Sequence, residues 1–106
     1  MKTLILMRHA KSSWKHPELK DHERGLNKRG KKDAPQMGAL LSENELVPQR
    51  ILASTAERSR MTAQAVVDAM HFTGDVSYLD TLYMAEPEIY LELLSLMPDD
   101  VERILV

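Results

Sequence analysis

The chain has 106 residues, enough for one small domain, and its hydrophobic fraction of 43% and charged fraction of 28% are typical of a globular protein. A formal net charge of −2 gives no reason to expect nucleic acid or an anionic membrane as a partner. The lack of cysteine excludes disulfides and thiolate metal sites and is consistent with a cytoplasmic location. The sequence shows no signal-peptide pattern and no apolar run that approaches the length of a membrane span. We therefore expect a single domain over residues 1–106.

The chain opens with a short apolar run, Thr3 to Met7, which is followed at once by Arg8 and His9. The run is too short for a buried helix and fits a buried strand. In open α/β sheets, ligands bind just beyond the carboxyl ends of the strands. The sequence thus places a fixed cation and a candidate nitrogen nucleophile at the edge where ligands bind, with Lys11 and Ser13 close by. The alternative is that Arg8 and His9 are ordinary polar residues that end a strand.

A charged stretch follows as far as Gly25 and predicts a surface loop. His16 and His22 lie among acidic residues in this loop, and we interpret them as solvated side chains rather than metal ligands. Asn27 suits the N-cap of the next helix, in which Pro35 predicts a kink or a late start. The apolar stripe of this helix comprises Ala34, Met37, Gly38 and Leu41. Its first turns are strongly basic, which could bind an anion, although a solvated helix face is our preferred interpretation.

The run Arg50 to Ala53 predicts a second buried strand, and Ser54 or Thr55 could cap the helix that follows. One stripe of that helix comprises Arg58, Met61, Thr62, Ala65, Val66, Ala69 and Met70. An inward arginine is unfavourable unless an anion meets it, and either a buried carboxylate or a bound phosphate would do so for Arg58. Helix N-termini also favour anions. Arg60 points off the stripe, and we expect it at the surface.

The remaining sequence predicts two further strands, Val76 to Leu79 and Arg103 to Val106, with a helix between them. Pro87 suits the first turn of that helix. Its apolar stripe comprises Ile89, Tyr90, Leu93, Leu94 and Met97. The alternation of strands and helices predicts an α/β fold with a mostly parallel sheet.

Four segments of the chain resemble the histidine phosphatase superfamily (branch 1), which has the phosphoglycerate mutase-like fold. These segments are L-M-R-H-A-K-S-S-W from Leu6, H-E-R-G-L-N-K-R-G from His22, S-T-A-E-R-S-R-M-T-A from Ser54 and L-Y-M-A from Leu82. The family's strand-end motif is Arg-His-Gly, and alanine in place of the glycine is associated with the branch of SixA-like phosphohistidine phosphatases. The resemblance implies a three-layer α/β/α sandwich.

The resemblance also implies a reaction and a set of site residues. His9 takes the position of the family's nucleophile, and Arg8 and Arg58 take positions that bind phosphate. Further candidates for phosphate contact are Lys11, Ser13, Ser54 and Arg24. The implied chemistry needs no metal or other cofactor, because guanidinium groups neutralise the phosphoryl oxygens while a phosphohistidine forms and is hydrolysed. The implied ligands are inorganic phosphate and a phosphorylated substrate, with a phosphohistidine protein favoured.

The chain departs from the family's pattern at two places. Most relatives carry a glutamate after the third strand as the acid for the leaving group, whereas this chain reads Leu79-Asp80-Thr81-Leu82 there. The remaining candidates for that acid are Asp80, Glu86 and Glu88. The family's second pocket histidine follows the fourth strand, and this chain ends at Val106, immediately before that position. We therefore expect a chain that lacks the C-terminal part of the fold.

These patterns favour a metal-independent phosphatase that acts on phosphohistidine. A missing acid matters least for an imidazole, which leaves more readily than an alkoxide. The second interpretation is a phosphatase of small phosphomonoesters, and the third is a phosphate-binding module or fragment that does not turn over.

Overall fold

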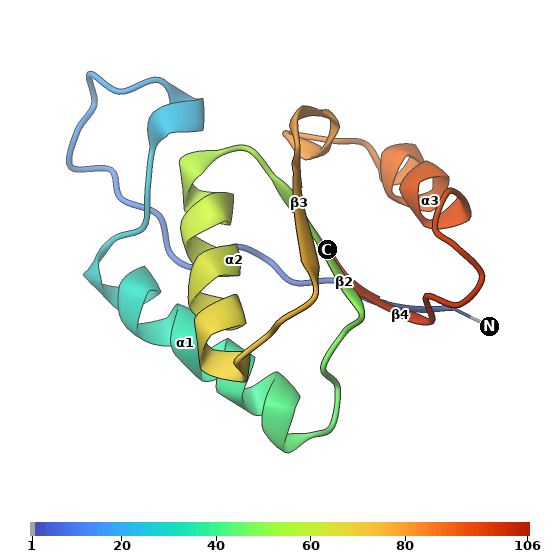
Figure 1. Cartoon of the computed structure of the whole chain (residues 1–106). Helices are drawn as coiled ribbons and strands as arrows, with labels where there is room; N and C mark the ends of the chain where they lie inside the picture. The colour runs from blue at the N-terminus through green and yellow to red at the C-terminus, as the bar shows by residue number, and fades with distance from the viewer. Residues whose placement is uncertain (1) are drawn as a thin grey trace.

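The computed structural model describes residues 2–106, which form a four-stranded sheet and three α-helices (Figure 1). The strands are β1 (Thr3–Ile5), β2 (Arg50–Ser54), β3 (Asp75–Leu79) and β4 (Arg103–Leu105). The helices are α1 (Lys28–Glu43), α2 (Glu57–Met70) and α3 (Pro87–Ser95), with short 3-10 helices η1 (Asp21–Glu23) and η2 (Asp80–Leu82). No helix among residues 2–106 has the length and apolarity that crossing a bilayer requires.

The four strands lie in the order β1-β4-β2-β3, and every neighbouring pair is parallel. Thr3 is in register with Arg103, so the first and last strands of the chain are partners. Strand β1 ends at Ile5 rather than at Met7 as predicted, although the Met7 N–H still donates to the Val106 carbonyl at 2.9 Å. The predicted parallel sheet is therefore confirmed, with a shorter first strand.

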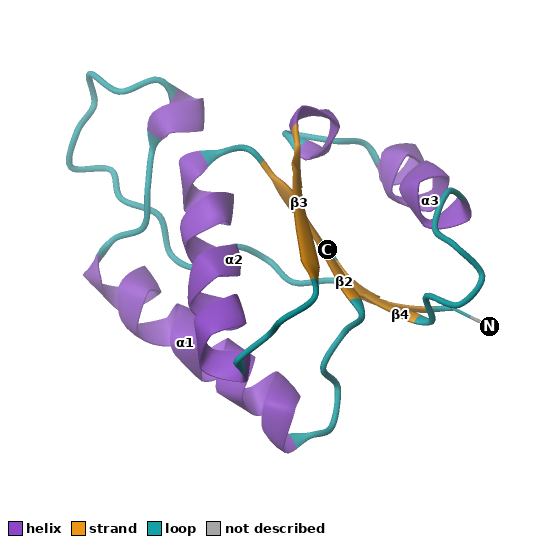
Figure 2. Ribbon diagram, in the orientation of Figure 1, coloured by secondary structure: helices purple, strands orange, loops and turns teal. Residues whose placement is uncertain are grey.

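Each face of the sheet packs against helices, because successive side chains of a strand point to opposite sides. On one face, Ile51 of β2 packs in a cluster with residues of α1 and α2. On the other face, Leu52 and Ile104 pack against residues of α3. Figure 2 shows α1 and α2 on one side of the strands and α3 on the other. The predicted three-layer α/β/α sandwich is confirmed.

Helices α1 and α2 differ from the sequence-based expectation in three details, although the cap of α1 agrees with it. Asn27 caps α1 as predicted, since its Oδ1 accepts a hydrogen bond from the Gly30 N–H at 2.8 Å. Of the kink or late start expected from Pro35, the late start is wrong, because α1 begins at Lys28 and runs through the proline. Met37 of the predicted apolar stripe is 42% exposed. The side-chain cap expected for α2 is also absent, because its N-cap is Ala56.

Gly30 lets α1 approach the chain segment that follows β1. It is buried, and a Cβ at this position would overlap the Lys11 carbonyl oxygen, which is backbone and cannot easily move. We expect Gly30→Ala to lower the free energy of unfolding by about 1–3 kcal/mol, as overpacking does. Gly25→Ala is the matched control, because its Cβ would crowd the flexible Met61 side chain and make an ordinary contact with Glu57 Cγ at 3.6 Å, without meeting backbone. Urea denaturation that found the two variants equally stable would contradict this account.

Candidate active site

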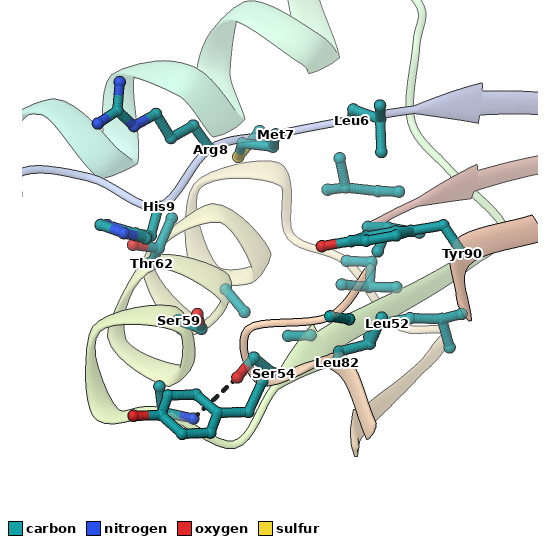
Figure 3. Close-up of a pocket in the computed structure, with 18 of the residues that line it drawn as sticks. Leu6, Met7, Arg8, His9, Leu52, Ser54, Ser59, Thr62, Leu82 and Tyr90 are labelled. Carbon is teal, nitrogen blue, oxygen red and sulfur yellow. Dashed lines mark hydrogen bonds between the residues drawn. The ribbon is translucent and has the colours of Figure 1, made fainter. Parts of the chain in front are cut away.

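A pocket of about 880 Å³ opens beside the segments that follow β1 and β2. The first turn of α2 and the chain from η2 into α3 complete its wall (Figure 3). Most of the lining is apolar. Its polar members are Arg8, His9, Ser54, Arg58, Ser59, Thr62, Tyr83 and Tyr90. The fold thus brings Arg8 and His9 to the same hollow as Arg58, nearly fifty residues later in the chain.

The His9 ring is held in one orientation by its own backbone. Its Nδ1 lies 2.8 Å from the Ala10 carbonyl oxygen. A carbonyl only accepts hydrogen bonds, so Nδ1 carries the proton and the neutral ring keeps a lone pair on Nε2. The Ala10 N–H donates to Thr62 Oγ1 at 3.0 Å, and the Thr62 hydroxyl donates to the Arg58 carbonyl at 2.8 Å. These bonds fasten the His9 segment to α2, and Figure 3 shows the two side chains next to each other.

Arg58 is 8% exposed and is met by a carboxylate. One guanidinium nitrogen donates to the Asp21 carbonyl at 2.8 Å, and the other terminal nitrogen donates to Asp21 Oδ2 at 3.0 Å. Of the two anions that the sequence left open, the carboxylate is therefore the one that this structure contains. A guanidinium has five N–H donors, and the bonds to Asp21 use two of them. The other three leave Arg58 able to bind an anion in the pocket that it lines.

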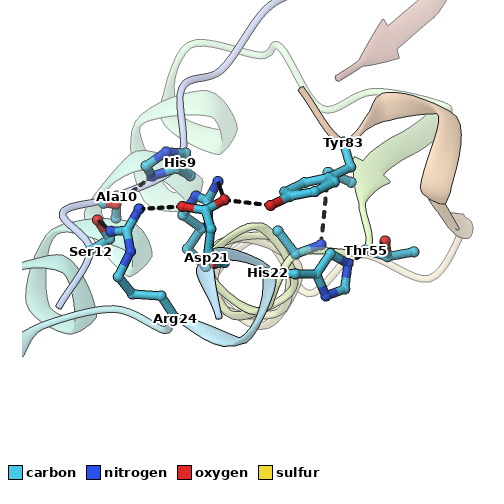
Figure 4. Close-up of polar contacts among 11 residues, drawn as sticks. His9, Ala10, Ser12, Asp21, His22, Arg24, Thr55 and Tyr83 are labelled. Carbon is cyan, nitrogen blue, oxygen red and sulfur yellow. Dashed lines mark hydrogen bonds and ion pairs between the residues drawn. The ribbon is translucent and has the colours of Figure 1, made fainter. Parts of the chain in front are cut away.

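The Asp21 carboxylate joins three segments of the chain, namely its own loop, α2 and the residues after η2 (Figure 4). Besides Arg58, it accepts hydrogen bonds from the Tyr83 hydroxyl at 2.5 Å and from Arg24 at 3.0 Å. The bonds from Tyr83, Arg24 and Arg58 hold the pKa of the Asp21 carboxyl well below its usual range. The same carboxylate raises the pKa of Tyr83. The ionised Asp21 carboxylate thus fixes the position of the Arg58 guanidinium.

We expect the stability of the chain to fall in acid partly through Asp21. Its pKa is lower in the folded chain than the unfolded value of about 3.9, so its bonds stabilise the fold above that pH. This stabilisation is lost as the pH falls through the folded pKa. In Asp21→Asn, the free energy of unfolding should decline less between about pH 5 and pH 3 than in the wild type.

The control for this titration is Asp75→Asn, which alters the exposed ion pair between Arg50 and Asp75. Denaturant titrations across the acid range compare the two variants. An Asp21→Asn variant with the same acid-dependent decline as the wild type would show that the bonds to Asp21 do not stabilise the fold.

The other predicted site residues are divided between this pocket and its surroundings. Ser54 lines the pocket, where its Oγ accepts a hydrogen bond from the Ala56 N–H at 3.1 Å. Arg8 is exposed and has no ion-pair partner among residues 2–106. Lys11, Ser13, Arg24, Asp80, Glu86 and Glu88 are not part of the pocket wall within the described chain. Arg24 is nevertheless connected to the pocket wall, because it donates a hydrogen bond to Asp21, which also accepts one from Arg58.

Sequence reasoning missed Asp21 and Tyr83 and misjudged His22. His22 is half-buried rather than solvated, and its Nε2 lies 2.8 Å from Thr55 Oγ1. The Thr55 hydroxyl in turn donates to Asp80 at 2.6 Å. Tyr83 belongs to the L-Y-M-A segment, so the resemblance marked its neighbourhood without giving it a role. Asp21 lies in a charged loop, where no periodic pattern distinguishes one acid from another.

His16, the other loop histidine, is exposed and lies 3.4 Å from Glu18. Across residues 2–106, no group of three His, Asp or Glu side chains is arranged to hold a metal ion.

Comparison with protein families gives a match to the histidine phosphatase superfamily (branch 1) over residues 4–82. The matched region includes β1 with the His9 segment, α2 with Arg58, and η2. It contains every residue of the Asp21 network except Tyr83, which follows it directly.

Two solved structures share the fold along almost the whole chain. The SixA structure from Agrobacterium tumefaciens has a TM-score of 0.88 and 37% identity and covers 97% of this chain. The SixA structure from Nakamurella multipartitia has a TM-score of 0.84 and 31% identity and covers 99% of it. An uncharacterized chloroplastic protein of Arabidopsis thaliana is 42% identical over 83 residues, 76% of this chain. The chain spans 66%, 57% and 38% of the length of these three relatives.

Proposed function

The chain belongs to the histidine phosphatase superfamily (branch 1), and from this membership we propose that it is a phosphatase with His9 as its covalent nucleophile and phosphohistidine as its substrate. The observation that supports this proposal most strongly is the convergence of Arg8, His9 and Arg58 on one pocket. Two cations beside an imidazole with a free Nε2 lone pair suit the charge and geometry of a phosphoryl group.

The reaction has two displacement steps. In the first, Nε2 of His9 attacks phosphorus, a new N–P bond forms, and the bond from phosphorus to the substrate's nitrogen breaks. The departing imidazole takes up a proton from the solvent. In the second step, water attacks phosphorus and releases a proton to the solvent, the N–P bond to His9 breaks, and inorganic phosphate leaves while His9 recovers its lone pair. The Ala10 carbonyl keeps the proton on Nδ1 throughout, so Nε2 remains the reacting atom.

Arg58 and Arg8 bind the phosphoryl oxygens in this proposal. The bonds that the Arg58 guanidinium donates to Asp21 fix it before the substrate arrives, so no ordering of that side chain is needed during the reaction. Arg8 follows β1 directly and has no competing carboxylate among residues 2–106, so it is available to a phosphate. Ser54 supplies a hydroxyl to the same pocket.

The carboxylates of the described chain favour phosphohistidine over a sugar phosphate. Asp80, Glu86 and Glu88 are the candidates for a leaving-group acid, and none of them lines the pocket within residues 2–106. Asp80 instead accepts a hydrogen bond from Thr55. An alkoxide leaving group depends strongly on such an acid, whereas an imidazole has a conjugate acid of near-neutral pKa and depends on it less. The phosphohistidine phosphatase name of the SixA relatives points to the same substrate class.

The test is to incubate the chain with radiolabelled phosphoramidate and with a protein that carries labelled phosphohistidine. We expect an acid-labile, alkali-stable label on the chain, which peptide mapping assigns to His9. Labelling by sugar phosphates at a comparable rate would replace this proposal with a phosphomonoesterase. Saturable phosphate binding without any label would identify a binding module instead.

A further inference from the structure

The basic residues of this chain are concentrated in one segment. Residues 8–32 contain nine of the fourteen lysines and arginines but only three of the sixteen acidic residues. The rest of the chain therefore has thirteen acids against five basic residues, so a net charge of −2 conceals two regions of opposite sign. The segment is also a structural unit, because Ser12 pairs with Leu26 and the Asn27 N–H donates to the Lys11 carbonyl at 2.9 Å.

Within this segment lies a second hollow of about 440 Å³, which we call the basic groove. Its basic lining residues are Lys15, His16, Arg24, Lys28 and Lys31. Two acids, Glu23 and Glu57, also line it, and Glu23 already accepts a hydrogen bond from the Lys20 N–H at 3.1 Å. Lys15, Lys28 and Lys31 are exposed, and none of them has an ion-pair partner among residues 2–106.

The basic groove adjoins the pocket that contains His9. Arg24 lines the groove, and its guanidinium donates to Asp21, which in turn binds Arg58 of the pocket wall (Figure 4). Trp14 lies over the same arginine, with the guanidinium carbon 3.7 Å from the ring centroid, although the residue is 77% exposed. An exposed tryptophan next to cations is typical of a surface that contacts another polypeptide.

We propose that the basic groove docks an acidic segment of the phosphorylated protein whose phosphohistidine enters the pocket. This inference rests on the proposed function for the identity of the partner. The unpaired lysines attract carboxylates of the substrate protein. Because the groove adjoins the pocket, these lysines would contact the substrate close to its phosphohistidine. A long nucleic acid fits the charge pattern less well, because the remaining thirteen acids repel a polyanion that extends beyond the groove.

The charge reversals Lys28→Glu and Lys31→Glu test the groove directly. Both side chains line it and are one helical turn apart on α1. The matched control is the pair Arg29→Glu and Lys32→Glu, which changes the charge of the same helix equally at exposed positions outside the groove. The probe is a fluorescein-labelled ten-residue peptide of alternating glutamate and alanine, and its glutamine counterpart is the neutral comparison.

We expect saturable binding of the glutamate peptide, measured by anisotropy, which weakens with added salt and changes the emission of Trp14, the chain's single tryptophan. The groove double variant should bind it at least about tenfold more weakly, and the control double variant less than about threefold. Equal losses in the two double variants, or equal binding of the glutamine peptide, would overturn the proposal. Tighter binding of a single-stranded oligonucleotide, or displacement of the peptide by inorganic phosphate, would also overturn it.

The peptide titration tests the docking surface and the labelling of His9 tests the proposed function, so either proposal can be refuted without the other. Lys28 and Lys31 do not line the pocket, so labelling by the small molecule phosphoramidate should be unchanged in the groove variant. A wild-type chain that binds the peptide but acquires no label would refute the proposed function alone. A chain that acquires the label but does not bind the peptide would refute the docking surface alone.

Discussion

Replacing His9 with alanine is expected to reduce phosphoryl labelling of the chain to background, a loss of about 10⁴-fold or more. The imidazole is the nucleophile of the first step in the proposal, and alanine leaves no atom at the Nε2 position to form a bond to phosphorus. Among residues 2–106, the His9 ring makes a hydrogen bond only to the neighbouring backbone, at the Ala10 carbonyl. We therefore expect the free energy of unfolding to change little, so that lost labelling is not a consequence of lost folding.

The control for this experiment is His71→Asn. His71 ends α2 with a φ of 54°, a conformation that asparagine tolerates better than most residues. It is not part of the pocket wall among residues 2–106, so His71→Asn should be labelled as the wild type is. A His9→Ala chain that acquires acid-labile phosphate at the wild-type rate would assign the nucleophile to another residue.

Arg58→Lys is expected to slow the labelling of His9 by about 100-fold or more. Lysine keeps the positive charge but loses the planar fork that binds Asp21 and that, in the proposal, binds a phosphoryl oxygen at the same time. The cost in stability should be modest, about 1 kcal/mol, because Asp21 keeps its bonds from Arg24 and Tyr83 and its side chain is 41% exposed. Single-turnover labelling and urea denaturation separate the two effects.

A double-variant cycle tests how Asp21 contributes. If Asp21 acts by orienting Arg58, then Asp21→Asn should slow labelling in the wild-type background and have little further effect in the Arg58→Lys background. Independent, multiplicative losses would show that Asp21 acts by another route. An Arg58→Lys chain that is labelled as fast as the wild type would remove Arg58 from the proposed phosphate site.

The fold was predictable because its signals are local. The short apolar runs at β1, β2 and β4 predict buried strands, and the Asn27 cap and Pro87 predict the starts of helices that the structure confirms. The errors are also physical. Helix α1 runs through Pro35 despite the lost backbone donor, because residues on both sides of the proline are buried against the rest of the fold.

The site was predictable only in part, because its contacts join distant segments. Arg8, His9 and Arg58 could be assigned from the family resemblance, and the structure brings them to one pocket. The partner of Arg58 could not be assigned. An arginine on the apolar stripe of α2 requires an anion, but the sequence does not say which residue supplies it. That anion is Asp21, 37 residues away in a loop with no periodic pattern.

The register of the sheet has a consequence for how the chain reaches its native state. Strand β1 lies at the edge of the sheet, and its partner is β4. The pairing of Thr3 with Arg103 therefore joins residues that are 100 positions apart in the sequence. Pairings between the two ends of a chain raise contact order and slow folding. During synthesis, β1 is made 100 residues before its partner β4, so the ladder between them forms only after β4 has been made. The bond between Ala10 and Thr62 needs only α2, which precedes β4, so the His9 segment can pack against that helix before β1 joins the sheet.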